Sequence, residues 1–86
     1  MKLLKFEASW CQPCKQLSET LSSMDMPWPV EVIDIDLEEN REQVINRGVR
    51  SVPTLILLDN NNKVVRRITG NNMTRSQLLD AFDLKG

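Results

Sequence analysis

Residues 2–24 read KLLKFEASWCQPCKQLSETLSSM, and the apolar pattern changes its period within this stretch. Lys2–Ala8 mixes apolar and charged residues over a length that is typical of a strand. From position 13 onward the apolar residues follow one stripe of a helix: Leu17, Leu21 and Met24. Pro13 suits the first turn of that helix, where its missing N–H costs nothing. We therefore expect a strand followed by a helix that ends near Met24.

The middle of the chain predicts a second strand and a second helix. Val30–Ile35 (VEVIDI) is β-branched and alternating, which predicts a second strand. Asp36–Arg47 is predicted to be helical, because its early acids and its late arginine complement the helix dipole and Gly48 is a natural stop. The apolar contacts that we expect from this helix are Val44 and Ile45.

The last third of the chain predicts a hairpin and a final helix. Thr54–Leu58 is a continuous apolar run, typical of a central strand buried on both faces, and Lys63–Thr69 follows it after a short polar turn. Thr74 and Gln77 fit a capping box at the start of the helix. Met73 and Leu78 are placed as a hydrophobic staple, and Leu78, Leu79 and Phe82 are expected to face the core.

The element order is thus βαβ followed by ββα. It predicts an α/β fold in which three helices pack on a four-stranded mixed sheet, with a parallel first pair and an antiparallel edge. The 86 residues suffice for one hydrophobic core, so we expect a single domain over residues 1–86.

Composition excludes several functional classes. The formal net charge of −1 supplies no basic field for nucleic acid or for a membrane surface. The longest nearly apolar run, Val52–Leu58, is far shorter than the roughly 20 residues of a membrane-spanning helix. The charges at Lys2 and Lys5 leave no room for a secretory apolar segment, so we expect a soluble, cytoplasmic protein. The absence of histidine removes the commonest general base and the commonest metal ligand.

Cys11 and Cys14 are the only cysteines of the chain. A disulfide between them would close too short a loop to stabilise the fold appreciably. A structural zinc site usually needs four ligands, and one chain offers two cysteines. The pair is therefore expected to switch between dithiol and disulfide.

The predicted helix assigns different roles to the two cysteines. Cys11 falls at the helix N-terminus, where unpaired N–H groups stabilise a thiolate and lower the pKa of the thiol. Cys14 lies one turn further along and is expected to be more buried. We therefore expect an exposed Cys11 to attack a substrate disulfide and Cys14 to resolve the resulting mixed disulfide.

Two further features are expected near the cysteines. Trp10 precedes Cys11 and offers a flat apolar wall that suits contact with an extended substrate. Val52-Pro53 precedes the buried strand, where a proline normally begins or edges a strand. The same dipeptide in a cis form would leave Val52 free to pair with a substrate backbone. Trp28 lies between two prolines and is expected to cover the core.

Two motifs of the chain resemble the thioredoxin family. Residues 10–15, WCQPCK, are similar to the family's Trp-Cys-Gly-Pro-Cys-Lys, and residues 48–55, GVRSVPTL, resemble a second signature whose proline is cis and faces the disulfide. The active-site motif that the resemblance implies, besides the cysteines, is Trp10, Gln12, Pro13 and Lys15. The implied substrate groove around Cys11 is formed by Trp10, Val52, Pro53 and Gly70. The implied architecture is a thioredoxin-like fold that lacks the strand and helix usually preceding the first strand.

The same resemblance implies a general protein disulfide reductase, an electron carrier that holds no cofactor and no metal. Its implied partners are proteins with disulfides and a flavin-dependent thioredoxin reductase that supplies electrons from NADPH. We expect such a protein to act as a monomer, without nucleic acid or membrane partners.

The chain departs from the family pattern at and beneath the cysteines. Gln12 replaces the glycine between them, which should alter the redox potential. Thioredoxins usually bury an aspartate where this chain has Lys5, and the usual lysine partner of that aspartate aligns with Val32. Glu7, or a water, is a candidate proton relay for Cys14. The alternative is that Lys5 and Glu7 are solvated.

Three other functions remain open from the sequence. A glutaredoxin-like oxidoreductase would use glutathione, but Gly70-Asn71-Asn72 lacks the second glycine and the acidic residues typical of a glutathione site. A non-enzymatic thioredoxin-like subunit would bind another protein without using the cysteines. Two cysteines from each of two chains would form a shared zinc site.

Overall fold

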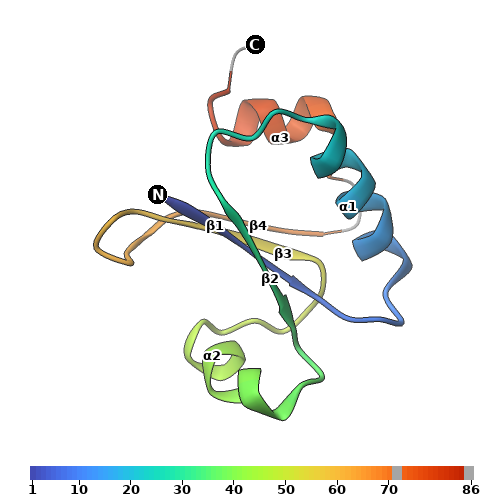
Figure 1. The fold of residues 1–86 in the computed structure, drawn as a ribbon, viewed down its shortest axis with the longest axis vertical. Helices are drawn as coiled ribbons and strands as arrows, with labels where there is room; N and C mark the ends of the chain where they lie inside the picture. Colours follow the sequence, from blue (N-terminus) through green and yellow to red (C-terminus); the bar gives the residue numbers. More distant parts are fainter. Residues whose placement is uncertain (71–72, 85–86) are drawn as a thin grey trace.

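The computed structural model describes residues 1–70 and 73–84 of the chain (Figure 1). Its elements follow the predicted order, with an additional 3-10 turn before the second helix. They are β1 (Lys2–Glu7), α1 (Gln12–Ser23), β2 (Val30–Asp34), η1 (Glu38–Asn40), α2 (Arg41–Asn46), β3 (Thr54–Leu58), β4 (Val64–Thr69) and α3 (Arg75–Ala81).

The strands form one mixed sheet in the order β2-β1-β3-β4. β1 and β2 are parallel, whereas β3 is antiparallel to both of its neighbours, β1 and β4. Every residue of β3 is buried, as predicted for a central strand. The predicted architecture of a four-stranded mixed sheet with three α-helices is therefore confirmed.

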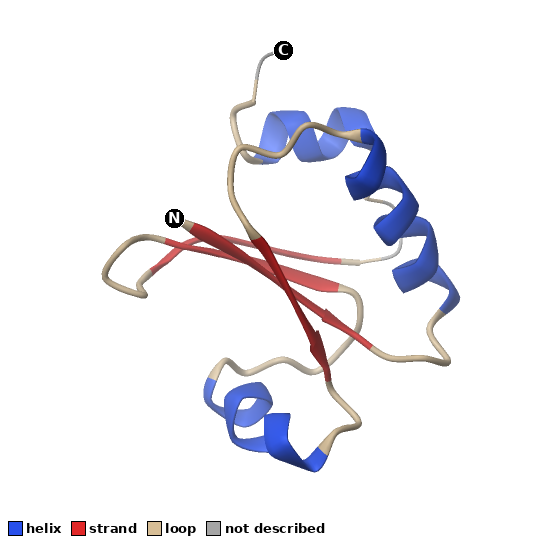
Figure 2. Ribbon diagram, viewed as in Figure 1, coloured by secondary structure: helices blue, strands red, loops and turns tan. Residues whose placement is uncertain are grey.

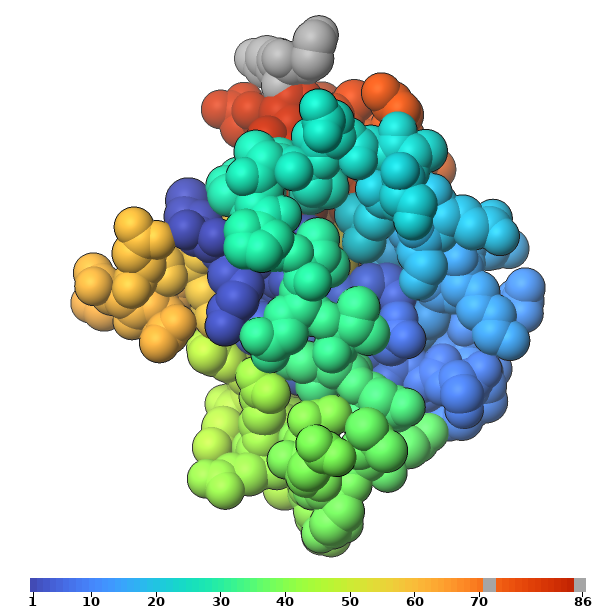
Figure 3. Space-filling view, in the orientation of Figure 1, coloured from blue at the N-terminus to red at the C-terminus, as the bar shows by residue number. Residues whose placement is uncertain are grey.

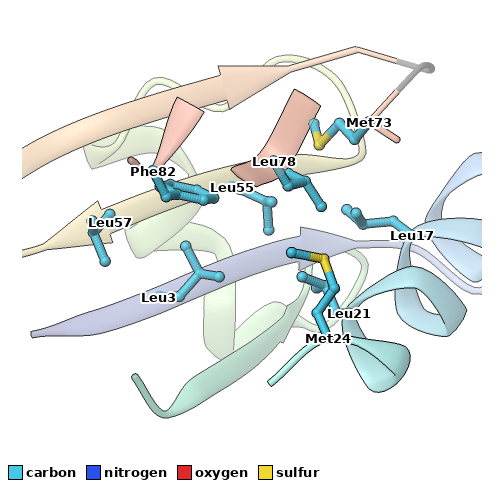
Figure 4. Close-up of a cluster of buried hydrophobic side chains, with 9 residues drawn as sticks. All are labelled: Leu3, Leu17, Leu21, Met24, Leu55, Leu57, Met73, Leu78 and Phe82. Atoms are coloured by element: carbon cyan, nitrogen blue, oxygen red, sulfur yellow. The ribbon is translucent and has the colours of Figure 1, made fainter. Parts of the chain in front are cut away.

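Helices cover both faces of this sheet (Figure 2). Because successive side chains of a strand point to opposite faces, Leu3 and Leu4 enter two different hydrophobic clusters. Leu4 packs on the side of α2, with Phe6, Ile33 and Ile56. Leu3 belongs to the cluster beneath α1 and α3 (Figure 4), which consists of Leu3, Leu17, Leu21, Met24, Leu55, Leu57, Met73, Leu78 and Phe82.

The cluster under α1 and α3 bears out the helical patterns of the sequence. Trp28 packs against it and meets Phe82 edge to face, with ring centroids 5.7 Å apart, so it covers the core as expected. At the start of α3, Thr74 and Gln77 form the predicted capping box, in which each side chain accepts a backbone N–H of the other residue. These contacts hold α3 and the loop after α1 on the same face of the sheet.

The segment between β2 and β3 differs from the prediction. Asp36–Arg47 is not one helix but the 3-10 turn η1 followed by the short helix α2. Val44 packs against the sheet as expected, but Ile45 is 65% exposed. Adjacent residues of a helix point in directions about 100° apart, so a helix of one or two turns presents only one of them to the sheet. Gly48, with φ of 64°, follows α2 as the expected stop.

The remaining differences lie at the ends of strands. β1, β2 and β4 are shorter by one residue than the sequence pattern predicted, and the residues outside them are Ala8, Ile35 and Lys63. The turn between β3 and β4 and the α2 segment protrude from the body of the molecule (Figure 3). Within residues 1–70 and 73–84, no helix has the length and apolar character needed to cross a membrane.

Candidate active site

Cys11 and Cys14 are joined by a disulfide at the start of α1, with their Cα atoms 5.2 Å apart. Cys11 is the N-cap of the helix, as predicted, and its Sγ accepts a hydrogen bond of 3.2 Å from the backbone N–H of Cys14. The leading sulfur is thus held against the positive end of the helix dipole. An anionic sulfur is stabilised at such a position.

Both cysteines are covered in the disulfide form. Cys11 is 4% exposed and Cys14 is 2% exposed, so the expectation that Cys11 would be exposed is wrong for this state. The physical reason is the apolar packing around the pair, to which Ala8, Ile35 and Val52 contribute. The disulfide is therefore enclosed by residues from three loops that follow β1, follow β2 and precede β3.

Trp10 lies outside the core. It is 68% exposed, and its Nε1–H donates a hydrogen bond of 2.9 Å to Asp36 Oδ2. This bond joins the loop before α1 to the loop after β2, across a sequence separation of 26 residues. Sequence reasoning missed Asp36, because no local pattern signals a contact of that separation.

The loop before β3 also contacts the cysteines, through Val52. The Val52–Pro53 peptide bond is cis, Pro53 is buried, and Val52 is half-buried. Strand pairing begins at Thr54, so the backbone of Val52 lies outside the sheet ladder. The side-chain hydroxyl of Thr54 donates a hydrogen bond of 2.7 Å to the Ser51 carbonyl, which holds this loop closed. Thr54 is a second residue whose part in the site the sequence did not indicate.

A groove of about 190 Å³ runs beside this loop. It brings together three of the predicted site residues, Pro13, Pro53 and Gly70, with Gln16, Thr20 and Met73 also in its lining. Gly70 has φ of 131°, a backbone conformation that favours glycine. Asn71 and Asn72, which entered the comparison with glutathione sites, lie outside the described residues.

The other predicted site residues do not line this groove. Gln12 and Lys15 are exposed on the first turn of α1, whereas Val52 contacts the cysteine cluster instead. Trp10 is held apart by its bond to Asp36. Of the four residues predicted to form the substrate groove, Pro53 and Gly70 line this groove together with Pro13, whereas Trp10 and Val52 do not.

Beneath α1 the structure corrects a further expectation. Lys5 is only 2% exposed, so the interpretation that Lys5 is solvated is wrong. Its Nζ forms an ion pair with Glu7 and donates a hydrogen bond of 2.7 Å to Ser18 Oγ. Its neighbour on β2 is Val32, which is 56% exposed, so the cation takes its counter-charge from its own strand rather than from the neighbouring one. The side chain of Glu7 is 30% exposed.

Over the described residues, no three or more Cys, Asp or Glu side chains are grouped so that they could hold a metal ion. The chemistry that the arrangement itself supports is the making and breaking of the Cys11–Cys14 disulfide.

Comparisons with known proteins agree with this geometry. A family model described as Thioredoxin matches residues 1–83. Thioredoxin H5 of Oryza sativa subsp. japonica is 31% identical over 70 residues, which is 80% of this chain and 52% of that protein. Thioredoxin of Bacillus subtilis is 40% identical over 58 residues, which is 65% of this chain and 56% of that protein. The matched stretches thus span about half the length of these relatives.

A solved structure resembles the chain over a larger share of both molecules. Thioredoxin 1 of Thermosipho africanus superposes with a TM-score of 0.78 and 26% sequence identity. The superposition covers 96% of this chain and 91% of that chain.

The contact between Trp10 and Asp36 yields a test of the site's construction. In Asp36→Ala the Nε1–H of Trp10 should exchange with solvent about fivefold faster, because a hydrogen bond of this kind contributes about 1 kcal/mol. Hydrogen exchange followed by NMR measures this rate, and the Nε1–H of Trp28 in the same spectrum is the internal control. Asp36→Asn keeps a side-chain acceptor and should preserve most of the protection. Equal exchange in Asp36→Ala and the unaltered protein would contradict the contact.

Proposed function

The chain belongs to the thioredoxin family, and we propose that it is a protein disulfide reductase that works by dithiol–disulfide exchange through Cys11 and Cys14. The observation that carries this proposal is a cysteine pair, joined as a disulfide, whose leading sulfur caps a helix beside a groove. In this proposal residues 1–86 act as one thioredoxin-like domain.

The first step is attack by the Cys11 thiolate on one sulfur of a substrate disulfide. A mixed disulfide forms, the substrate disulfide breaks, and the departing substrate thiolate takes a proton from solvent. The N-terminal position of Cys11 supports this role, because the N–H of Cys14 that donates to its Sγ also stabilises negative charge there. Gln12 and Lys15, exposed on the same turn, would face the bound substrate.

The loop before β3 and the adjoining groove suit an extended substrate. Val52 has backbone groups outside the sheet ladder, which can pair with a substrate chain as an added strand would. Pro13, Pro53 and Gly70 line the groove beside it. Trp10 presents an exposed aromatic face next to Cys11, and Asp36 holds its orientation.

The second step is attack by Cys14 on the Sγ of Cys11. The Cys11–Cys14 disulfide forms, and the substrate leaves as a thiol once it has gained a proton. Cys14 must lose its own proton, and we propose that Glu7 accepts it. Glu7 is linked to the Cys14 segment through Lys5 and Ser18, but these hydrogen bonds end at the Cys14 carbonyl, so a water would carry the proton from the thiol to Glu7. The partial exposure of Glu7 then lets it pass the proton to solvent.

The oxidised pair then has to be reduced again. We propose that a flavin-dependent thioredoxin reductase supplies the electrons from NADPH, so that the chain carries electrons without holding a cofactor or a metal. The proposed setting is the cytoplasm, where such a protein stays reduced and acts as a monomeric donor to proteins with disulfides. Nucleic acid and membrane partners have no place in this proposal.

The roles of the two cysteines can be separated by single substitutions. Cys14→Ser should accumulate a covalent mixed disulfide with insulin, because the resolving thiol is missing, whereas Cys11→Ser should form none. Non-reducing electrophoresis detects the mixed disulfide, and the turbidity of reduced insulin measures the rate of insulin reduction. The double variant Cys11→Ser, Cys14→Ser provides the background. If the unaltered protein reduces insulin no faster than this background, the function is that of a non-enzymatic binding subunit.

The electron donor distinguishes the proposed function from that of a glutaredoxin. We expect insulin reduction to run faster with NADPH and thioredoxin reductase than with glutathione, NADPH and glutathione reductase. Consumption of NADPH, read at matched protein concentrations, measures both rates. A higher rate with glutathione would assign the chain to the glutaredoxin type.

The proposed proton acceptor predicts a pH-dependent defect. In Glu7→Gln, release of substrate from the mixed disulfide should slow about tenfold near neutral pH, less than the 10²–10⁴-fold typical of general base catalysis because water can substitute. The defect should vanish at alkaline pH, where hydroxide removes the thiol proton. Stopped-flow measurement from about pH 6 to about pH 9 spans the titration of a thiol. Identical profiles for the variant and the unaltered protein would remove Glu7 from the mechanism.

A further inference from the structure

Lys5, which is 2% exposed, is the only buried side chain with a formal charge among the described residues. Lysine is almost never fully buried unless its charge is paired, because removing an ammonium from water is costly. The pairing here consists of Glu7 on the same strand and Ser18 on α1. Hydrophobic packing does not explain why a charged side chain is buried at this position.

The position of Lys5 in the fold directs its ammonium toward the cysteine helix. Leu3 belongs to the cluster beneath α1, and Lys5 and Glu7 follow it at the two-residue spacing that keeps side chains on one face of a strand. The neighbours of Lys5 in the sheet, Val32 on β2 and Leu55 on β3, are apolar. Polar contacts for the ammonium therefore come from its own strand and from the helix above it.

A chain of hydrogen bonds connects this ammonium to the turn that holds the resolving cysteine. Lys5 Nζ donates to Ser18 Oγ at 2.7 Å, and Ser18 Oγ donates to the Cys14 carbonyl at 3.1 Å. The Cys14 N–H in turn donates to the Sγ of Cys11. Positive charge is thus held beneath α1, one turn after Cys14, and hydrogen bonds link it to the turn that carries both sulfurs.

We propose that Lys5 is a positioning residue for disulfide exchange, whose buried charge favours the reduced, thiolate form of the Cys11–Cys14 pair over the disulfide. The inference rests on the proposed function, since it concerns how readily the same pair accepts electrons. Lys5 acts through α1, because the hydrogen bonds of its Nζ go to Glu7 and to Ser18 on that helix.

The direction of the effect follows from the charges on each side of the reaction. Two glutathione molecules reduce the disulfide: the protein S–S bond breaks, a glutathione S–S bond forms, and two electrons pass to the protein sulfurs. The two protons of the glutathione thiols pass to the protein sulfurs or, where Cys11 becomes a thiolate, one passes to Cys14 and the other to solvent. The disulfide is neutral and the thiolate is negative, so a nearby cation stabilises the reduced side.

Glu7 reduces this effect without cancelling it. Its carboxylate lies on the partly exposed side of the pair, where water screens it, whereas the ammonium is buried and bonded to α1. The net electrostatic effect of the ion pair on the sulfurs is therefore that of a positive charge. A close opposite charge typically changes such an equilibrium tenfold or more, and we expect about tenfold here because Glu7 opposes it.

The test is the equilibrium of the full-length protein with reduced and oxidised glutathione at neutral pH, measured by trapping the thiols. Lys5→Met should lower the equilibrium constant for reduction about tenfold, which corresponds to about 30 mV for a two-electron couple. Lys5→Arg keeps the charge and should recover most of this loss. Lys2→Met removes an exposed lysine of the same strand and should change the constant less than about twofold.

A second variant keeps the test decisive if Lys5→Met does not fold, as judged by circular dichroism. Glu7→Gln removes the counter-charge and should raise the equilibrium constant for reduction, opposite in sign to Lys5→Met. The proposal would be overturned if folded Lys5→Met had the same equilibrium constant for reduction as Lys2→Met. A decrease in the constant of Glu7→Gln would overturn it as well.

This equilibrium is measured without protein substrate or reductase, so its outcome can be told apart from that of the insulin assay. Failure to reduce insulin by a pair that titrates normally with glutathione would refute the proposed function alone. An unchanged constant in Lys5→Met of a protein that reduces insulin would refute the role of Lys5 alone.

Discussion

The packing of α1 against β1 and β3 positions every part of the candidate active site. Leu17 and Leu21 anchor the helix in the cluster that contains Leu3 and Leu55. With its body fixed there, the N-terminus of α1 lies beyond the end of β1, and Cys11 caps it. The loops after β2 and before β3 then contribute Ile35 and Val52 to the packing around the cysteines, because β2 and β3 are the two neighbours of β1 in the sheet.

Two sources of positive charge act on the cysteine pair in this arrangement. One is the N-terminus of α1, whose Cys14 N–H donates to the leading sulfur. The other is Lys5, which is buried beneath α1 and linked to that turn through Ser18. The resemblance to the family places Lys5 where an aspartate is usual, so the charge expected at this place is inverted in this chain. Glu7, on the same strand, supplies the carboxylate that would otherwise be missing there.

The residues around the disulfide come from several segments of the chain and form separate surfaces. Trp10 stands exposed and is tied to Asp36, while Val52 packs on the cysteines themselves. The groove lies to one side, lined by Pro13, Pro53 and Gly70. An extended substrate that contacts all of them would cross the N-terminus of α1, where the disulfide is held. The enclosure of the disulfide in this state also means that attack on it requires access through these loops.

Local patterns in the sequence determined the order of elements, the buried central strand, the capping box of α3 and the place of Cys11 at a helix start. These features depend on residues within a few positions of one another, so periodicity and capping chemistry suffice to predict them. Only the tertiary structure decided that β1 lies between β2 and β3, that Ile45 faces outward and that Cys11 is covered in the disulfide. It also decided the partners of Lys5 and Trp10, since Ser18 and Asp36 reach them from other elements. Contacts of that kind depend on how strands and helices pack together, and no spacing along the chain records them.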